Sequence, residues 1–141
     1  RMGSWLHHLL FRIDMANVPY YRELFTSLGW RVVRDTDDVL GVVGANGELV
    51  EFTGPYHPDV TNDYDGKGLN HLAVAVESVA DVDAFVGYMA DQGIVPQFGT
   101  PRHRPEFAEY STTTDGDYYH VMFTSPDNLL LEVVYAGPRH R

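Results

Sequence analysis

LHHLLFRI at residues 6–13 and LNHLAVAV at residues 69–76 are two copies of one pattern, and this pattern decides the fold. Each copy has His at its third position and continues as a mostly apolar run of the length of a strand. Farther along, LVEFTGP at residues 49–55 resembles LLEVVYAGP at residues 130–138, with Glu at the third position of both. Matched pairs of this kind indicate an internal duplication, so the chain contains the same unit twice.

The second copy is longer than the first. His8 and His71 are 63 positions apart, whereas Glu51 and Glu132 are 81 positions apart, which leaves 18 extra residues in the second copy. We place the extra residues at 99–116 and expect a loop there, with one strand near residues 107–112. Long insertions often shape a binding site.

Both copies predict the same order of elements. Each helix is followed by a glycine that stops it, Gly29 in the first copy and Gly93 in the second. The first copy predicts a strand, a helix and three strands at residues 5–13, 18–28, 31–34, 39–43 and 48–53. The second predicts them at residues 69–76, 78–91, 94–98, 118–123 and 129–135. The prediction is an α+β fold of two βαβββ modules (5–55 and 69–136), joined by a linker (56–68) in a single domain (5–136).

Composition narrows the class of protein. The net charge is −10, which argues against a nucleic-acid or membrane partner. The absence of cysteine excludes disulfides, thiolate metal sites and cysteine nucleophiles. No apolar run approaches the roughly 20 residues of a membrane span, and no signal peptide is visible, so we expect a cytoplasmic protein. We interpret residues 1–4 as a cloning remnant.

Strand parity tests whether the repeated His and Glu residues share a surface. Side chains alternate along a strand, and His8, Glu51, His71 and Glu132 each lie opposite a purely apolar row. A lone strand histidine is more often structural, but four candidates at equivalent places favour a metal site. Two imidazoles with one or two carboxylates suit Zn, Ni, Co, Mn or Fe(II).

Further candidates lie in the second copy. His120 is a candidate acid or base. Its spacing from Glu132 does not show whether the two side chains share a face of the sheet, because a hairpin turn lies between them. Arg102 belongs to a local positive patch that could receive an anionic substrate group, or that is simply a solvated loop. Tyr119, like its neighbour Tyr118, is a candidate wall of a pocket or an ordinary strand residue.

The order of these motifs resembles the vicinal oxygen chelate superfamily, which includes glyoxalase I, bleomycin resistance proteins and extradiol dioxygenases. The marks are the opening strand with His8, YYRELF at residues 20–25 before LGW at 28–30, GLNH at 68–71, and SPDN at 125–128 leading to Glu132. The segment at 116–123 looks more like the many uncharacterised small members. The resemblance implies paired βαβββ modules that form an open, cup-shaped mixed sheet around one divalent metal.

The resemblance also implies roles for single residues. His8, His71 and Glu132 match the three ligands shared by most metal-dependent members, and Glu51 matches the fourth ligand of glyoxalase I. Dioxygenases of the superfamily generally leave that fourth position open for oxygen. Arg12 sits where glyoxalase I has an arginine that holds a substrate carboxylate.

Three functions remain open. The first is a metal-dependent lyase or isomerase that moves a proton on a small, oxygen-chelated substrate, with Glu132 or Glu51 as the base. The second is an extradiol-type Fe(II) dioxygenase that uses His120 or a nearby Tyr as acid and base. The third is a metal-free binding protein of the bleomycin-resistance type. We expect a homodimer, because two such modules leave sheet edges uncovered.

Overall fold

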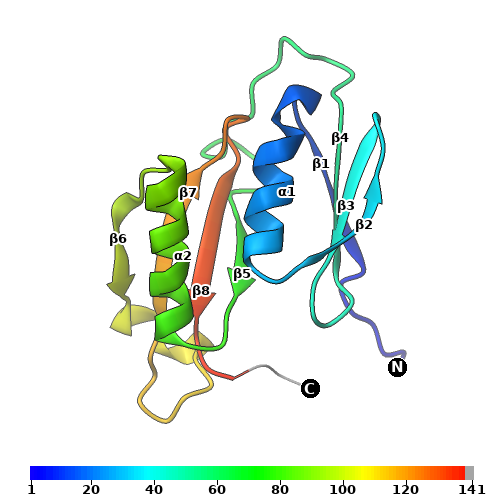
Figure 1. Ribbon diagram of the computed structural model, residues 1–141. Coiled ribbons are helices and arrows are strands. Elements are labelled where there is room, and N and C mark those ends of the chain that lie inside the picture. The colour runs from blue at the N-terminus through cyan, green and yellow to red at the C-terminus, as the bar shows by residue number, and fades with distance from the viewer. Residues whose placement is uncertain (139–141) are drawn as a thin grey trace. The chain divides into compact units, whose positions relative to one another are not determined.

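The computed structural model describes residues 1–138, which form two compact units, residues 1–61 and residues 62–138. The boundary falls inside the expected linker. Each unit combines one long helix with one four-stranded sheet, and the two units are described separately (Figure 1). No helix within the described part of the chain is long and apolar enough to cross a membrane.

Unit 1 has the order strand, helix and three strands, with a short 3₁₀ helix before the long one. Its elements are β1 (His8–Arg12), η1 (Met15–Asn17), α1 (Val18–Ser27), β2 (Arg31–Asp35), β3 (Val39–Val43) and β4 (Leu49–Thr53). The strand order is β1-β4-β3-β2, with β1 parallel to β4 and the other pairs antiparallel. The helix packs its apolar face on the sheet, where Tyr21 stacks on Phe52 with ring centroids 4.5 Å apart.

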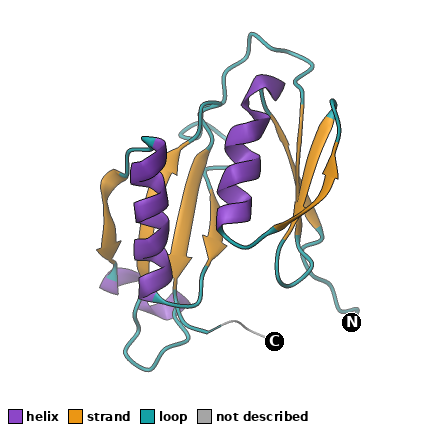
Figure 2. Ribbon diagram, viewed as in Figure 1, coloured by secondary structure: helices purple, strands orange, loops and turns teal. Residues whose placement is uncertain are grey.

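Unit 2 repeats this order, with a second 3₁₀ helix inserted. Its elements are β5 (Leu72–Ala75), α2 (Val79–Gln92), β6 (Gln97–His103), η2 (Pro105–Tyr110), β7 (Tyr119–Thr124) and β8 (Leu130–Tyr135). The strand order β5-β8-β7-β6 matches that of unit 1, with β5 parallel to β8. The helix starts at Ser78, whose side chain caps it by accepting the backbone N–H of Asp81. The prediction of two βαβββ modules is therefore confirmed (Figure 2).

The inserted segment differs from the prediction. The strand expected at 94–98 begins at Gln97 and continues to His103, through an irregularity in its pairing with β7. Arg102 and His103 are therefore strand residues that pair with His120 and Tyr119, rather than loop residues.

The strand expected near residues 107–112 was wrong, because residues 105–110 form η2. Pro105 begins this 3₁₀ helix, where its fixed φ suits a helical turn and its missing N–H costs no hydrogen bond.

The first strand of each unit is shorter than expected. Trp5 is 83% exposed and Leu6 is 66% exposed, and β1 begins only at His8. In unit 2, β5 begins at Leu72, so His71 lies just before the strand. Both candidate histidines thus lie at the entrance of the first strand of their unit.

Candidate metal centre

The two units place their His and Glu candidates in the same register. In unit 1, Leu10 pairs with Glu51 across the parallel strands β1 and β4, and His8 precedes Leu10 by two residues. In unit 2, Ala73 pairs with Glu132 across β5 and β8, and His71 precedes Ala73 by two residues. Side chains two residues apart on an extended segment point to the same side. The duplication is therefore preserved in the sheet register as well as in the sequence.

In unit 2 this register brings the imidazole and the carboxylate together. His71 Nε2 lies 3.2 Å from Glu132 Oε1. The Glu132 side chain is 3% exposed, whereas that of His71 is 37% exposed. The pair therefore joins a buried carboxylate to a ring that solvent reaches.

The other carboxylate oxygen of Glu132 has partners on β7 and just before it. The hydroxyl of Tyr118 donates a hydrogen bond of 2.6 Å to Glu132 Oε2. His120 Nδ1 lies 3.5 Å from the same oxygen, and both ring nitrogens of this buried histidine lack a hydrogen-bond partner among the described residues. Buried polar atoms are nearly always hydrogen-bonded, so unpartnered nitrogens beside a carboxylate mark a place where a further polar group or ion fits.

The hairpin register explains why His120 lies near Glu132. Met122 pairs directly with Glu132, and His120 pairs with Val134, so alternate residues of β7 share the face of Glu132. The sequence did not determine which face of the sheet carries His120, and it offered Tyr118 only as a pocket wall or a strand residue, not as a partner of Glu132. The signal that would have found Tyr118 is its even spacing from His120, once the turn at residues 125–129 is placed.

These contacts act on the ionisation of the two groups. Burial works to raise the pKa of Glu132, but the contacts of His120 and Tyr118 and the charges of His120 and His71 outweigh it, so the pKa lies below its usual value. Burial, followed by the hydrogen bond to Glu132 and its negative charge, raises the pKa of Tyr118. The site thus favours a charged carboxylate beside a neutral phenol.

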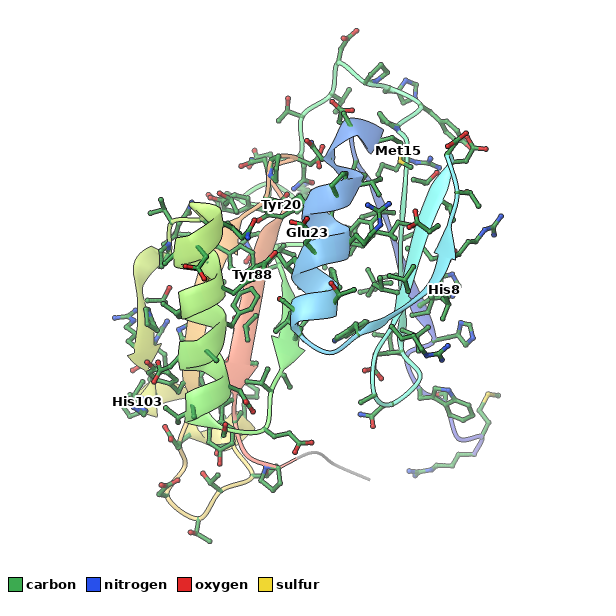
Figure 3. All side chains as sticks on the ribbon, viewed as in Figure 1. His8, Met15, Tyr20, Glu23, Tyr88 and His103 are labelled. Carbon is green, nitrogen blue, oxygen red and sulfur yellow. The ribbon has the colours of Figure 1, made fainter. Side chains whose placement is uncertain are left out.

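In unit 1 the equivalent residues are less enclosed. His8, Leu10 and Arg12 are the exposed residues of β1, and Glu51 on β4 is half-buried. Figure 3 labels His8 at the start of this strand. The Arg12 guanidinium donates to Gly54 O at 2.8 Å and lies 3.9 Å from the centre of the Tyr56 ring. Arg12 is therefore held in place within its own unit.

The two remaining candidates, Tyr119 and Arg102, lie on opposite faces of the sheet of unit 2. Tyr119 is on the opposite face of β7 and donates to Asp83 Oδ1 on α2 at 2.6 Å. Arg102 pairs with His120 across β6 and β7 and is exposed. The structure therefore brings Arg102 to the side of the sheet that carries His120, and it does not bring Tyr119 there.

The donor set fits a divalent metal in chemical terms. Imidazole nitrogen and carboxylate oxygen are the ligands of Zn, Ni, Co, Mn and Fe(II), and His71 and Glu132 present them side by side. Within residues 1–138, no three His, Asp or Glu side chains gather into a metal-holding group. The structure thus supplies one His–Glu pair at contact distance in unit 2 and one register-equivalent pair in unit 1.

A comparison with known families identifies this arrangement of motifs and strands. A sequence model described as the Glyoxalase/Bleomycin resistance protein/Dioxygenase superfamily matches residues 5–133. The chain belongs to this superfamily. Among proteins of curated function, none matches the glyoxalase-superfamily chain.

Solved structures agree with this assignment. A glyoxalase/dioxygenase from Nostoc punctiforme is 18% identical with a TM-score of 0.69, covering 96% of this chain and 99% of that one. A glyoxalase/bleomycin resistance protein from Albidiferax ferrireducens T118 is 18% identical with a TM-score of 0.68, covering 94% and 99%. A lactoylglutathione lyase from Agrobacterium tumefaciens is 14% identical with a TM-score of 0.63, covering 96% of both chains. At these identities the likeness establishes the fold, as the sequence predicted.

Proposed function

We propose that this glyoxalase-superfamily chain is a metal-dependent lyase or isomerase that moves a proton on a small substrate chelated through oxygen. The observation that carries the proposal is the His71–Glu132 pair, a buried carboxylate 3.2 Å from an imidazole nitrogen. The register-equivalent pair of His8 and Glu51 supports it. We propose these four residues as metal ligands, and the identity of the divalent metal stays open among Zn, Ni, Co, Mn and Fe(II).

The chemistry divides between the metal and the side chains. A bound divalent metal supplies Lewis acidity that polarises a substrate carbonyl and acidifies the neighbouring carbon. Both carboxylate oxygens of Glu132 have partners: Oε1 contacts His71, and Oε2 accepts a hydrogen bond from Tyr118. The side chain of Glu51 has no hydrogen-bond or ion-pair partner within its unit among the described residues. Glu51 is therefore the better candidate for the base that removes and returns the proton.

The direct test is proton exchange at the carbon beside a carbonyl. Metal-loaded protein in D₂O is mixed with a panel of small 2-hydroxycarbonyl compounds, and deuterium incorporation is followed by ¹H NMR. We expect exchange that requires the metal and falls by about two to four orders of magnitude in Glu51→Gln, the usual scale for loss of a general base. The matched control Glu109→Gln changes an exposed carboxylate and should keep the rate. Exchange that is unchanged in Glu51→Gln would remove Glu51 from the chemistry.

A second candidate function is favoured by one observation. Tyr118 and His120 flank Glu132, and an extradiol-type Fe(II) dioxygenase needs such groups as acid and base. In that reaction Glu51 would stay off the metal. Oxygen uptake with a catechol that requires Fe(II) and is undisturbed by Glu51→Gln would favour this function over proton transfer.

Substrate and partner proposals follow from the surface. Arg12 and Arg102 are exposed cations, and we propose that they receive anionic groups of the substrate. The hydrogen bond from Tyr119 to Asp83 gives that tyrosine a structural role instead.

We also propose a homodimer, because β1 and β2 are the edge strands of one sheet, and β5 and β6 are the edge strands of the other. Sedimentation as a 15.9 kDa monomer at micromolar concentration would contradict the dimer. A cytoplasmic location stays a prediction.

A further inference from the structure

We propose that the residue immediately before each candidate histidine is a positioning residue that turns the ring's Nε2 toward the metal. In unit 2 this residue is Asn70, and in unit 1 it is His7. The inference rests on the proposed metal site, and it adds two residues that are not themselves ligands. It concerns the tautomer of the histidines, which can be measured without any metal or substrate.

The side-chain amide of Asn70 can be oriented in only one way. Its Nδ2 donates to the backbone carbonyl of Tyr64 at 2.7 Å, and its Oδ1 lies 2.8 Å from His71 Nδ1. The flipped amide would place its oxygen against the carbonyl oxygen of Tyr64, where neither atom can donate. The contact with Tyr64 therefore fixes the oxygen of Asn70 on the side of His71.

The orientation of Asn70 determines where His71 carries its proton. An amide oxygen can only accept a hydrogen bond, so His71 Nδ1 must donate it. In the neutral ring the lone pair is then on Nε2, the nitrogen that lies 3.2 Å from Glu132 Oε1. Two acceptors at this distance repel each other unless a proton or a metal cation lies between them. Asn70 thus prepares Nε2 as a ligand beside a carboxylate ligand.

The segment that carries Asn70 is held within its own unit. Asn62 Nδ2 donates to Asn128 O at 3.0 Å, and Asn128 Nδ2 donates to Asn62 O at 2.8 Å. These reciprocal bonds fasten the start of the segment to the turn between β7 and β8. The contacts of Asn70 with Tyr64 and His71 are separate from this anchor.

Unit 1 repeats the relationship with a different side chain. His7 Nδ1 lies 3.0 Å from His8 Nδ1, and the two rings meet edge to face at 88°. His7 is the residue of unit 1 that corresponds to Asn70 in unit 2. Each of the two contacts the Nδ1 atom of the histidine that follows it. We assign the proton to His8 Nδ1, with His7 as acceptor, which leaves His8 Nε2 free for the metal. Outer partners of this kind fix the tautomer of many metal-binding histidines.

The test reads the tautomer of His71 directly. The ¹⁵N shifts of its two ring nitrogens are measured in metal-free protein at a pH where the ring is neutral, with the resonances assigned by their loss in His71→Ala. We expect the Nδ1–H form in the wild type, where the oxygen of Asn70 accepts from Nδ1. In Asn70→Ala we expect a shift toward the Nε2–H form. Zn²⁺ affinity, measured by competition with a chelator, should fall about 10- to 100-fold in Asn70→Ala.

A matched variant separates positioning from loosening of the segment. Asn62→Ala removes the anchor to Asn128 and leaves Asn70 intact, so the tautomer of His71 should be unchanged. An Nε2–H form in the wild type, or an Nδ1–H form that persists in Asn70→Ala with undiminished Zn²⁺ affinity, would overturn the inference. A wild type that has the Nδ1–H form and yet binds no metal would refute the proposed function and leave the tautomer assignment standing.

Discussion

His71 Nε2 lies 3.2 Å from Glu132 Oε1, because β5 pairs with β8 in a register that sets Ala73 opposite Glu132. The same register in unit 1 sets Leu10 opposite Glu51, with His8 in the place of His71. The metal hypothesis thus rests on a relationship that the fold produces twice. The chemistry depends on how the carboxylate of Glu132 is held.

Removal of the Tyr118 hydroxyl should destabilise the protein. Tyr118→Phe deletes a 2.6 Å hydrogen bond to a carboxylate that is 3% exposed, and hydrogen bonds to buried charged groups contribute about 1.5–3 kcal/mol. We expect a loss of this size in the free energy of unfolding, measured by urea denaturation at neutral pH. Tyr110→Phe, at a residue that is 67% exposed, serves as the control and should change it little. Equal stability of both variants would show that the Tyr118 bond does not stabilise the fold.

The bond from Tyr119 to Asp83 predicts a change of stability at alkaline pH. This hydrogen bond, together with desolvation and the charge of Asp83, raises the pKa of Tyr119 from 10.0 to about 12. A folded-state pKa above the unfolded value means that the bond stabilises the fold fully below pH 10 and is lost as the pH rises toward 12. The difference in melting temperature between wild type and Tyr119→Phe should therefore be constant up to pH 10 and shrink above it. A difference that grows above pH 10 has the wrong sign for this account.

Phe52 is the centre of the core of unit 1. Its ring is 1% exposed and stacks on Tyr21 at 4.5 Å and on Phe11 at 5.7 Å. Phe52→Ala should cost about 3–5 kcal/mol in the free energy of unfolding, the usual range for a buried aromatic side chain. Val33→Ala, at a residue that is 46% exposed, should cost far less. A loss below 1 kcal/mol for Phe52→Ala would contradict the packing described for this sheet.

Sequence periodicity predicted most of the fold because strands such as β1 and β4 of unit 1 alternate between a covered and an open face. Val50 and Phe52 are buried and Glu51 is half-buried, as parity required. The inserted segment was harder, because the irregularity between Gln97 and Arg102 breaks the alternation on which strand prediction depends. The 3₁₀ helix that begins at Pro105 is too short for its apolar residues to show a recognisable helical spacing.

The candidate site was predictable only in part, for a similar reason. His71 and Glu132 were visible as repeated residues, and the structure brings them into contact. The face of His120 depended on the register of the hairpin, which one residue in the turn would invert. Asn70 gave no sequence signal of its own, because its effect depends on the carbonyl of Tyr64, a backbone atom whose position only the fold determines.

The most direct test of the central claim is a metal titration of protein purified without a His tag. Zn²⁺, Ni²⁺, Co²⁺, Mn²⁺ and Fe²⁺ are titrated into metal-free wild type, His71→Ala and the control His103→Ala, whose exposed ring pairs with Asp117 away from Glu132. The account predicts stoichiometric binding by wild type and His103→Ala, and its loss in His71→Ala with the circular dichroism spectrum unchanged. A wild type that binds none of these metals, as a metal-free binding protein would, contradicts the account, and so does a His71→Ala variant that keeps its metal.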